Sequence, residues 1–324
     1  MLMLLIIIVY LLPTVYSDQT ISYDIPIPRS MTSNDFVQST VDYWTPERMA
    51  NAQPKDALVV DQELSAWSLS HHPLEPRSDV LERSIPATAP FENVTKSSMS
   101  SESRSTTPRV SGKAFFVMNG RNYLCSGSVV VASNRDTVIT AGHCVYDYEL
   151  QMWASRWVFI PQYNNGSALL GTWVARRLTT LSNWGYYQDY NSDAAIVLMH
   201  ADSQGKHIQQ FTGGLGIKFN GNKQVNIHAF GFPKNMLNGE MMSICTGLTF
   251  NGLGIVPRFN GVYTVCGMTG GSSGGPWIQE YDTETMLGQQ MSLTSFMIIN
   301  RPGILFGPYF NTDIYNMYKQ YEIL

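Results

Sequence analysis

The segment Val138-Ile-Thr-Ala-Gly-His-Cys144 is an apolar run that ends in a small-residue turn, a histidine and a cysteine. Its β-branched residues predict a short buried strand, and Ala-Gly predicts the turn that follows. A histidine that accepts and returns a proton must be held in place yet stay open on one side, and a strand end meets both needs. A lone histidine is more often a structural residue at a loop edge whose hydrogen bonds are satisfied, but the Thr-Ala-Gly-His-Cys context favours a catalytic role. His143 is therefore the candidate base.

A second segment, Met268-Thr-Gly-Gly-Ser-Ser-Gly-Gly-Pro276, surrounds two serines with glycines. Glycines permit a tight turn that exposes a hydroxyl and lets backbone N–H groups converge where an oxyanion forms. Gly-Ser runs are usually flexible linkers, but this one lies between a cysteine-containing strand and the apolar Trp277. Ser273 is preferred to Ser272 as nucleophile because it directly precedes Gly-Gly-Pro, and the N–H groups of Gly271 and Ser273 are the candidate oxyanion donors.

The third segment, Asn191-Ser-Asp193, opens the apolar run 194–199. An acid at the start of a buried strand needs a hydrogen-bonding partner, and the second nitrogen of His143 can supply one. The alternative is an exposed turn acid, and Asp189 is a nearby rival. Asp193 is preferred because the apolar strand follows it directly.

These segments occur in the order His, Asp, Ser, and residues 112–324 resemble trypsin-like (chymotrypsin-fold) serine peptidases. The match rests on Thr140-Ala-Gly-His-Cys144, Asp193-Ala-Ala-Ile-Val-Leu198 and Gly271-Ser-Ser-Gly-Gly-Pro276. It is closest to the glutamyl-endopeptidase-like, secreted branch. The resemblance implies an all-β fold of two six-stranded antiparallel β-barrels, with the active site between them.

The resemblance also implies roles for these residues. Ser273 attacks the scissile carbonyl, His143 takes and returns the proton, and Asp193 fixes the tautomer. An acyl-enzyme forms and water releases it. The strand Ser295-Phe296-Met297 looks like the one that binds the substrate backbone.

The sequence departs from the family at two places. In trypsin an aspartate precedes the nucleophile and pairs with the new N-terminal amine, whereas this chain has Ser272. Propeptide removal is therefore expected to unblock the cleft instead of ordering it. Residues 266–270 contain no acid for a Lys or Arg substrate, and no histidine follows His228 for a Glu substrate. Met268 hints at an uncharged specificity pocket.

The rest of residues 110–324 favours β-structure. Short apolar runs between turn residues predict strands at 114–118, 128–132, 137–140, 194–199, 225–230, 261–265 and 293–299. Near the C-terminus, Asn311 offers an N-cap, and Ile314, Tyr318 and Tyr321 recur at helical spacing. A terminal helix is expected there.

The N-terminal third has a different composition. Residues 1–17 are apolar and too short for a membrane span, which predicts a signal peptide and secretion. Residues 18–109 are rich in Ser, Thr, Pro and acids, which predicts a largely disordered propeptide or linker. Patches at 36–44 and 57–69 could dock on a surface. Cleavage after Arg109 would make Val110 the mature start; the alternative is a disordered extension that is never removed.

Four cysteines in a secreted chain imply disulfides, with three possible connectivities. Their grouping in the sequence favours Cys125–Cys144 and Cys245–Cys266. The alternative, four reduced thiols, requires a cytosolic location. No cofactor or metal is expected, because no metal-ligand spacing is present. The sequons at Asn93 and Asn165 predict glycosylation.

Charge excludes one class of partner. The net charge is −4, and no basic run or Arg/aromatic stripe suggests nucleic acid. We expect a monomer that acts on protein or peptide substrates, is held by its own propeptide, and is free of the membrane once the signal is removed.

Two enzyme alternatives fail and a third reading stays open. Gly271-Ser-Ser-Gly-Gly275 also fits the nucleophile turn of α/β-hydrolases, but those enzymes place the histidine after the serine. Cysteine nucleophiles fail because all four cysteines are better used in bridges. The remaining alternative is a catalytically inactive homologue that acts as a secreted binding protein.

Overall fold

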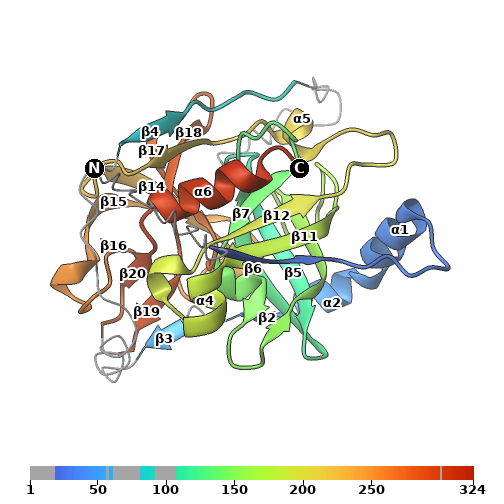
Figure 1. Ribbon diagram of the computed structural model, residues 1–324, viewed down its shortest axis with the longest axis horizontal. Coiled ribbons are helices and arrows are strands. Elements are labelled where there is room, and N and C mark those ends of the chain that lie inside the picture. Colours follow the sequence, from blue (N-terminus) through green and yellow to red (C-terminus); the bar gives the residue numbers. More distant parts are fainter. Residues whose placement is uncertain (1–18, 56–57, 61–80, 92–106, 300) are drawn as a thin grey trace, which may run out of the picture.

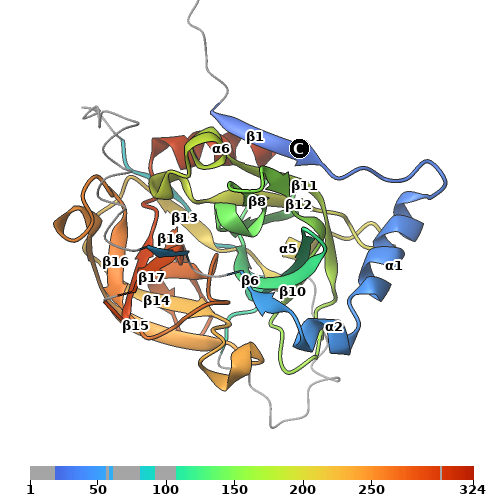
Figure 2. The same cartoon turned by 90° about the horizontal axis from the view of Figure 1, so that it is seen from below.

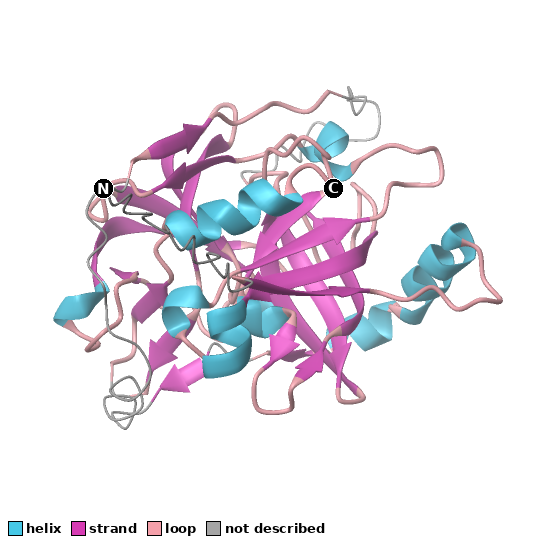
Figure 3. Cartoon of the chain, in the orientation of Figure 1, coloured by secondary structure: helices cyan, strands magenta, loops and turns pink. Residues whose placement is uncertain are grey.

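The computed structural model describes residues 19–55, 58–60, 81–91, 107–299 and 301–324. Two large β-sheets dominate it, and the helices are few and short (Figures 1 and 3). None of the helices in the described ranges is long and apolar enough to span a membrane. The helices are α1 (Ser33–Tyr43), α2 (Pro46–Ala50), α4 (Ser182–Tyr187), α5 (Ile208–Thr212) and α6 (Thr312–Tyr321).

The first sheet closes into a six-stranded antiparallel barrel in the order β11-β10-β5-β6-β7-β12, because β12 pairs back onto β11. Closure leaves the barrel without free edges. Its strands are β5 (Ser111–Met118), β6 (Arg121–Val129), β7 (Thr137–Thr140), β10 (Ser155–Pro161), β11 (Trp173–Leu181) and β12 (Ala195–Met199). A small ribbon of β8 (Tyr146–Asp147) and β9 (Met152–Trp153) stands beside it.

The second sheet has the order β3-β19-β20-β16-β15-β14-β17-β18-β13-β4. Its pairs are antiparallel except β13 with β18 and β3 with β19, which are parallel. The strands from the C-terminal half are β13 (Gly216–Phe219), β14 (Asn226–Gly231), β15 (Ser243–Asn251), β16 (Val262–Val265), β17 (Pro276–Asp282), β18 (Leu287–Leu293), β19 (Phe296–Ile298) and β20 (Ile304–Gly307). Helix α6 lies against β11, β12 and β13 and so contacts both sheets (Figure 1).

Successive side chains along the barrel strands point alternately into and out of the barrel, and both faces are apolar. In β5, Ala114 and Phe116 belong to the interior core, whereas Phe115 belongs to a second cluster on the outer face. The outer cluster also holds Val158 of β10 and Trp44. An apolar outer face exposed to water would lose its burial energy. It therefore needs a cover, and the N-terminal segment provides one.

The segment expected to be largely disordered is ordered over much of its described length. Strand β1 (Thr20–Asp24) pairs antiparallel with β11, and β2 (Gln53–Pro54) pairs parallel with β6. Helices α1 and α2 flank the barrel (Figure 2). The expectation of disorder is wrong for residues 19–55, because contacts with the barrel surface stabilise this segment. The amino-acid composition of the segment does not include those contacts. The patch at 36–44 does dock, since the Trp44 ring is buried and its N–H donates to the Arg156 carbonyl at 2.7 Å.

Two other N-terminal strands reach the second sheet. They are β3 (Leu58–Val60), paired with β19, and β4 (Arg83–Ile85), paired with β13. The predicted signal peptide at 1–17, the rest of the patch at 61–69 and the sequon at Asn93 lie outside the described residues. Val110, the predicted mature start, is fully buried at the entry to β5. Cleavage after Arg109 stays a prediction, and it would require local opening of this turn.

The predicted C-terminal helix is confirmed as α6, and the Asn311 side chain accepts from the N–H groups of Asp313 and Ile314. The run 137–140 is β7 with the predicted bounds. The run 293–299 is not one strand. Strand β18 ends at Leu293 and β19 begins at Phe296, and between them the backbone of Thr294 is hydrogen-bonded to Gly274 and Gly275 of the serine loop.

Candidate active site

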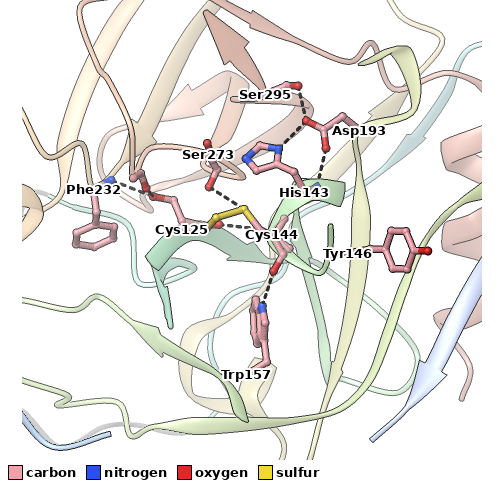
Figure 4. Close-up of a disulfide and its surroundings, with 12 residues drawn as sticks. Cys125, His143, Cys144, Tyr146, Trp157, Asp193, Phe232, Ser273 and Ser295 are labelled. Carbon is pink, nitrogen blue, oxygen red and sulfur yellow. Dashed lines mark hydrogen bonds and ion pairs between the residues drawn. A yellow bond between two sulfur atoms is a disulfide. The ribbon is translucent and has the colours of Figure 1, made fainter. Parts of the chain in front are cut away.

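His143 lies in a single helical turn, Gly142–Cys144, directly after β7. Its ring is 2% exposed. The backbone N–H of His143 donates to Asp193 Oδ1 at 2.9 Å, and Nδ1 lies 2.9 Å from Asp193 Oδ2. The carbonyl of Cys144 accepts from the Trp157 indole at 3.1 Å, and the Cys125–Cys144 disulfide ties the turn to β6 (Figure 4). Hydrogen bonds to Asp193 therefore hold His143 itself, and the bonds of Cys144 hold the turn that carries it.

Asp193 precedes β12 and is fully buried. Besides the two His143 contacts, its Oδ2 accepts from the Ser295 hydroxyl at 2.5 Å. Three donors thus satisfy a carboxylate that is removed from water. Because an ionised carboxylate only accepts, Nδ1 of His143 carries a proton and Nε2 is left as the basic nitrogen.

Ser273 lies on the far side of the imidazole from Asp193 (Figure 4). Its Oγ and His143 Nε2 are both buried, and neither has a hydrogen-bond partner in the described part of the chain. Gly274 follows at φ +82°, where a Cβ would come within 2.4 Å of the Ser126 carbonyl oxygen. The N–H of Ser126 on β6 donates to the Ser273 carbonyl at 2.7 Å. The serine loop belongs to the second sheet but is held by the first barrel.

Backbone donors around Ser273 fall into two groups. The N–H groups of Ser272, Gly274 and Gly275 all donate to backbone carbonyls. Within the described residues, those of Gly271 and Ser273 donate to no protein acceptor. Gly271 has φ +98°, a conformation that glycine adopts without strain. The structure thus leaves unused the two N–H groups that the sequence indicated for an oxyanion.

The strand predicted to bind substrate, 295–297, has three distinct environments. The Ser295 side chain contacts Asp193. Phe296 is buried and stacks on Phe306, with ring centroids 4.8 Å apart, so its side chain is part of the core. The backbone of Met297 pairs with Val59 of β3. The edge assigned to substrate is therefore occupied by the chain's own N-terminal segment.

Met268 is buried in an apolar cluster that includes Ile227, Ala229 and Trp277, with Met236 and Met297 packed against it.

Both predicted disulfides, Cys125–Cys144 and Cys245–Cys266, are confirmed. Donor atoms of Cys125, His143 and Cys144 lie within 4.8 Å of one another. The two sulfurs are bonded to each other, so this group offers no thiolate to a metal ion. Asn165 is exposed in a turn, and its glycosylation stays a prediction.

Comparison with known proteins gives a family model, Trypsin, that matches residues 103–249. The structure of protease Anisep from Arthrobacter nicotinovorans is 32% identical, with a TM-score of 0.60, over 66% of this chain and 96% of that one.

The chain belongs to the trypsin-like serine protease family.

Three further proteins are similar to this chain over different lengths. The thermostable serine protease AL20 from an extremophilic microorganism is 32% identical, with a TM-score of 0.60, over 65% of this chain and 96% of that one. A Glu endopeptidase, 17% identical with a TM-score of 0.53 over 68% of this chain and 94% of that one, shares the fold. An extracellular metalloprotease of Bacillus subtilis (strain 168) is 33% identical over 78 residues, 24% of each chain. This chain therefore matches about a quarter of that curated relative.

The departure of this trypsin-like chain at Ser272 has a structural counterpart. Its hydroxyl donates to the Thr269 carbonyl at 2.7 Å and so closes the turn locally. Sequence reasoning missed the contact of Ser295 with Asp193 and the role of Ser126 beneath the serine loop. No local signal marks either residue, because each acts on a segment more than 100 residues away.

Proposed function

We propose that this chain is a secreted serine endopeptidase that hydrolyses peptide bonds through an acyl-enzyme. Ser273 Oγ attacks the scissile carbonyl while His143 Nε2 takes its proton and later gives it to the leaving amine. Asp193 keeps the proton on Nδ1 and stabilises the imidazolium that forms. The N–H groups of Gly271 and Ser273 bind the oxyanion.

One observation carries this proposal. The buried atoms without partners around the site, Ser273 Oγ and His143 Nε2, are the two between which the mechanism passes a proton. An unsatisfied buried hydroxyl and imidazole nitrogen are costly for a purely structural site. The N–H groups of Gly271 and Ser273, which donate to no acceptor among the described residues, support the same reaction.

Secretion and processing form the second part of the proposal. Two formed disulfides favour an oxidising compartment. The 18–109 segment acts as a propeptide, and β3 blocks the substrate edge of β19 until it is released. Because Met268 is buried among apolar side chains, we expect preference for an uncharged side chain before the scissile bond.

Labelling with a fluorophosphonate probe tests the activity. Wild-type protein should label and should cleave a mixed peptide library, and Ser273→Ala should do neither. Ser272→Ala is the matched control, because it removes the neighbouring hydroxyl, which donates only to Thr269. If neither wild type nor Ser272→Ala labels, even when β3 is displaced by replacing residues 58–60 with Gly-Pro-Gly, the chain is instead an inactive homologue that acts by binding.

A further inference from the structure

A lysine is buried at the junction of the two sheets. Lys113 of β5 is 0% exposed, and its Nζ lies 3.0 Å from Glu240 Oε1. The ammonium also lies 4.9 Å from the ring centroid of Phe115 and 4.4 Å from that of Tyr163. A buried cation is costly unless paired. Among the described residues, the ion-pair partner of this buried ammonium is Glu240, in the β14–β15 loop.

Glu240 holds a second bond to the barrel. Its Oε2 accepts from the Tyr163 hydroxyl at 2.6 Å. Burial raises the pKa of Glu240, but the Tyr163 hydrogen bond and the Lys113 ammonium outweigh burial and lower it overall. The carboxylate is thus charged at neutral pH and fastened to two barrel residues. The loop end that carries it cannot move without breaking both bonds.

The other end of this loop contacts the serine loop. The Ser126 hydroxyl accepts from the Phe232 N–H at 2.9 Å and donates to the Gly271 carbonyl at 2.8 Å. A Cβ on Gly271 would lie 2.4 Å from the Phe232 carbonyl oxygen, so the two backbones touch. The Lys234 N–H donates to the Gly270 carbonyl at 2.8 Å. The peptide units that aim the Gly271 N–H therefore rest on residues 232–234.

Asn235 extends this contact. Its side-chain amide donates to the Gly267 carbonyl at 2.8 Å and accepts from the Thr269 hydroxyl at 2.7 Å. One loop, 232–240, is thereby bonded to the barrel at Glu240 and to the serine loop along 267–271.

We propose that the Lys113–Glu240 ion pair holds the 232–240 loop so that the N–H groups of Gly271 and Ser273 stay in position for the oxyanion. Lys113 is a positioning residue for the serine loop and touches no substrate. This inference rests on the proposed function. In this proposal the Lys113–Glu240 pair holds the serine loop through the 232–240 loop, without an ion pair between a new N-terminal amine and position 272, where this chain has Ser272.

The ion pair gives a pH signature. Burial, together with the nearby Lys234 and opposed by Glu240, lowers the pKa of Lys113 to about 8. The charged or titratable groups facing Lys113 are Glu240, Lys234 and Tyr163. Burial raises the pKa of the Tyr163 hydroxyl, so this group stays neutral over the pH range of the test. Loss of the ammonium above pH 8 frees the loop, and kcat falls. Because the unfolded pKa is the higher one, at 10.5, the unfolded chain binds more protons between these values. Deprotonation of Lys113 therefore raises the free energy of unfolding between pH 8 and pH 10.5. The loss of kcat in this range is then not caused by denaturation.

The test compares pH profiles of kcat and KM in full-length chains that label with fluorophosphonate. Glu240→Gln keeps an acceptor for Tyr163 but removes the charge that supports the ammonium, so the alkaline limb of kcat should move down by about one pH unit. Lys113→Met should lower kcat at pH 7 by about tenfold to a hundredfold, as loss of oxyanion donors does, with little change in KM. The limb at pH 8 should also disappear.

Lys223→Met is the matched control. Burial also lowers the pKa of Lys223 to about 8, but in the described part of the chain its ammonium donates to Asn260 and not to the 232–240 loop. This variant should keep the wild-type profile. If the alkaline limb of kcat does not move in Glu240→Gln, the inference is overturned, even if Lys113→Met does not fold. The inference is also overturned if this limb disappears in Lys223→Met. If wild type hydrolyses nothing, the proposed function fails first.

Discussion

Replacing Ser295 by alanine should separate the stability of the site from its catalysis. The Ser295 hydroxyl is one of three donors to Asp193, and both other donors belong to His143. Ser295→Ala removes the outer bond and leaves Asp193 bonded to the ring Nδ1 and to the backbone N–H of His143, each at 2.9 Å. The tautomer and the orientation of the ring are therefore preserved.

The expected magnitudes follow from this geometry. A hydrogen bond to a charged group contributes about 1.5–3 kcal/mol, and one between neutral groups about 0.5–1.5 kcal/mol. Asp193 is fully buried, so no water replaces the lost donor at once. Unfolding free energy should fall by about 2 kcal/mol. Because the His143 bonds remain, kcat should fall by less than about fivefold, equivalent to roughly 1 kcal/mol of barrier.

Urea unfolding and peptide hydrolysis measure the two effects. Ser292→Ala is the control, since Ser292 is equally buried but donates to the neutral Pro308 carbonyl at 2.8 Å. It should cost about 1 kcal/mol and leave kcat unchanged. A fall in kcat beyond a hundredfold in Ser295→Ala would show that the His143 contacts do not orient the ring unaided. Equal stability losses in the two variants would contradict the charge argument.

Three other outcomes are expected. Asp193→Asn should lower kcat by about 10⁴ without unfolding the chain, because an amide can donate to Nδ1 and favour the wrong tautomer; activity above 1% of wild type would contradict this. Removing either disulfide should cost about 3 kcal/mol, since the closed loops are similar in length, with separations of 19 and 21 residues. Only loss of the disulfide at Cys144, beside His143, should also lower kcat. Replacing residues 58–60 with Gly-Pro-Gly should raise hydrolysis by the full-length chain, because proline cannot donate to the β19 edge; an unchanged rate would show that β3 does not block substrate.

Sequence patterns located the parts of the site that are local. His143, Asp193 and Ser273 each adjoin a short apolar run, and an apolar run next to a turn is a signal that a few residues contain. The helix at 312–321 could be predicted for the same reason, since its N-cap and spacing lie within one segment. The disulfides were also predictable, because each joins cysteines close in sequence.

Contacts between distant segments could not be predicted this way. Lys113 reads as an ordinary polar residue on a strand, and its burial depends on Glu240, 127 residues later. The N-terminal segment is poor in apolar residues, so its composition indicated disorder. Its few large side chains, such as Trp44, suffice because the barrel supplies an apolar outer face around Phe115. Composition measures what a segment can bury by itself, whereas this segment buries its side chains against another part of the chain.

The same reasoning bears on what proteolysis would release. Strand β1 is bonded along β11, and the outer apolar cluster includes Trp44 and Met49. A cut after Arg109 breaks one covalent bond but none of these contacts, so residues 19–55 would stay on the barrel after cleavage. The β3 strand is different, because it joins the second sheet through β19 alone. Unblocking the substrate edge therefore needs the departure of β3, and the segment that covers the barrel can remain in place as part of the folded enzyme.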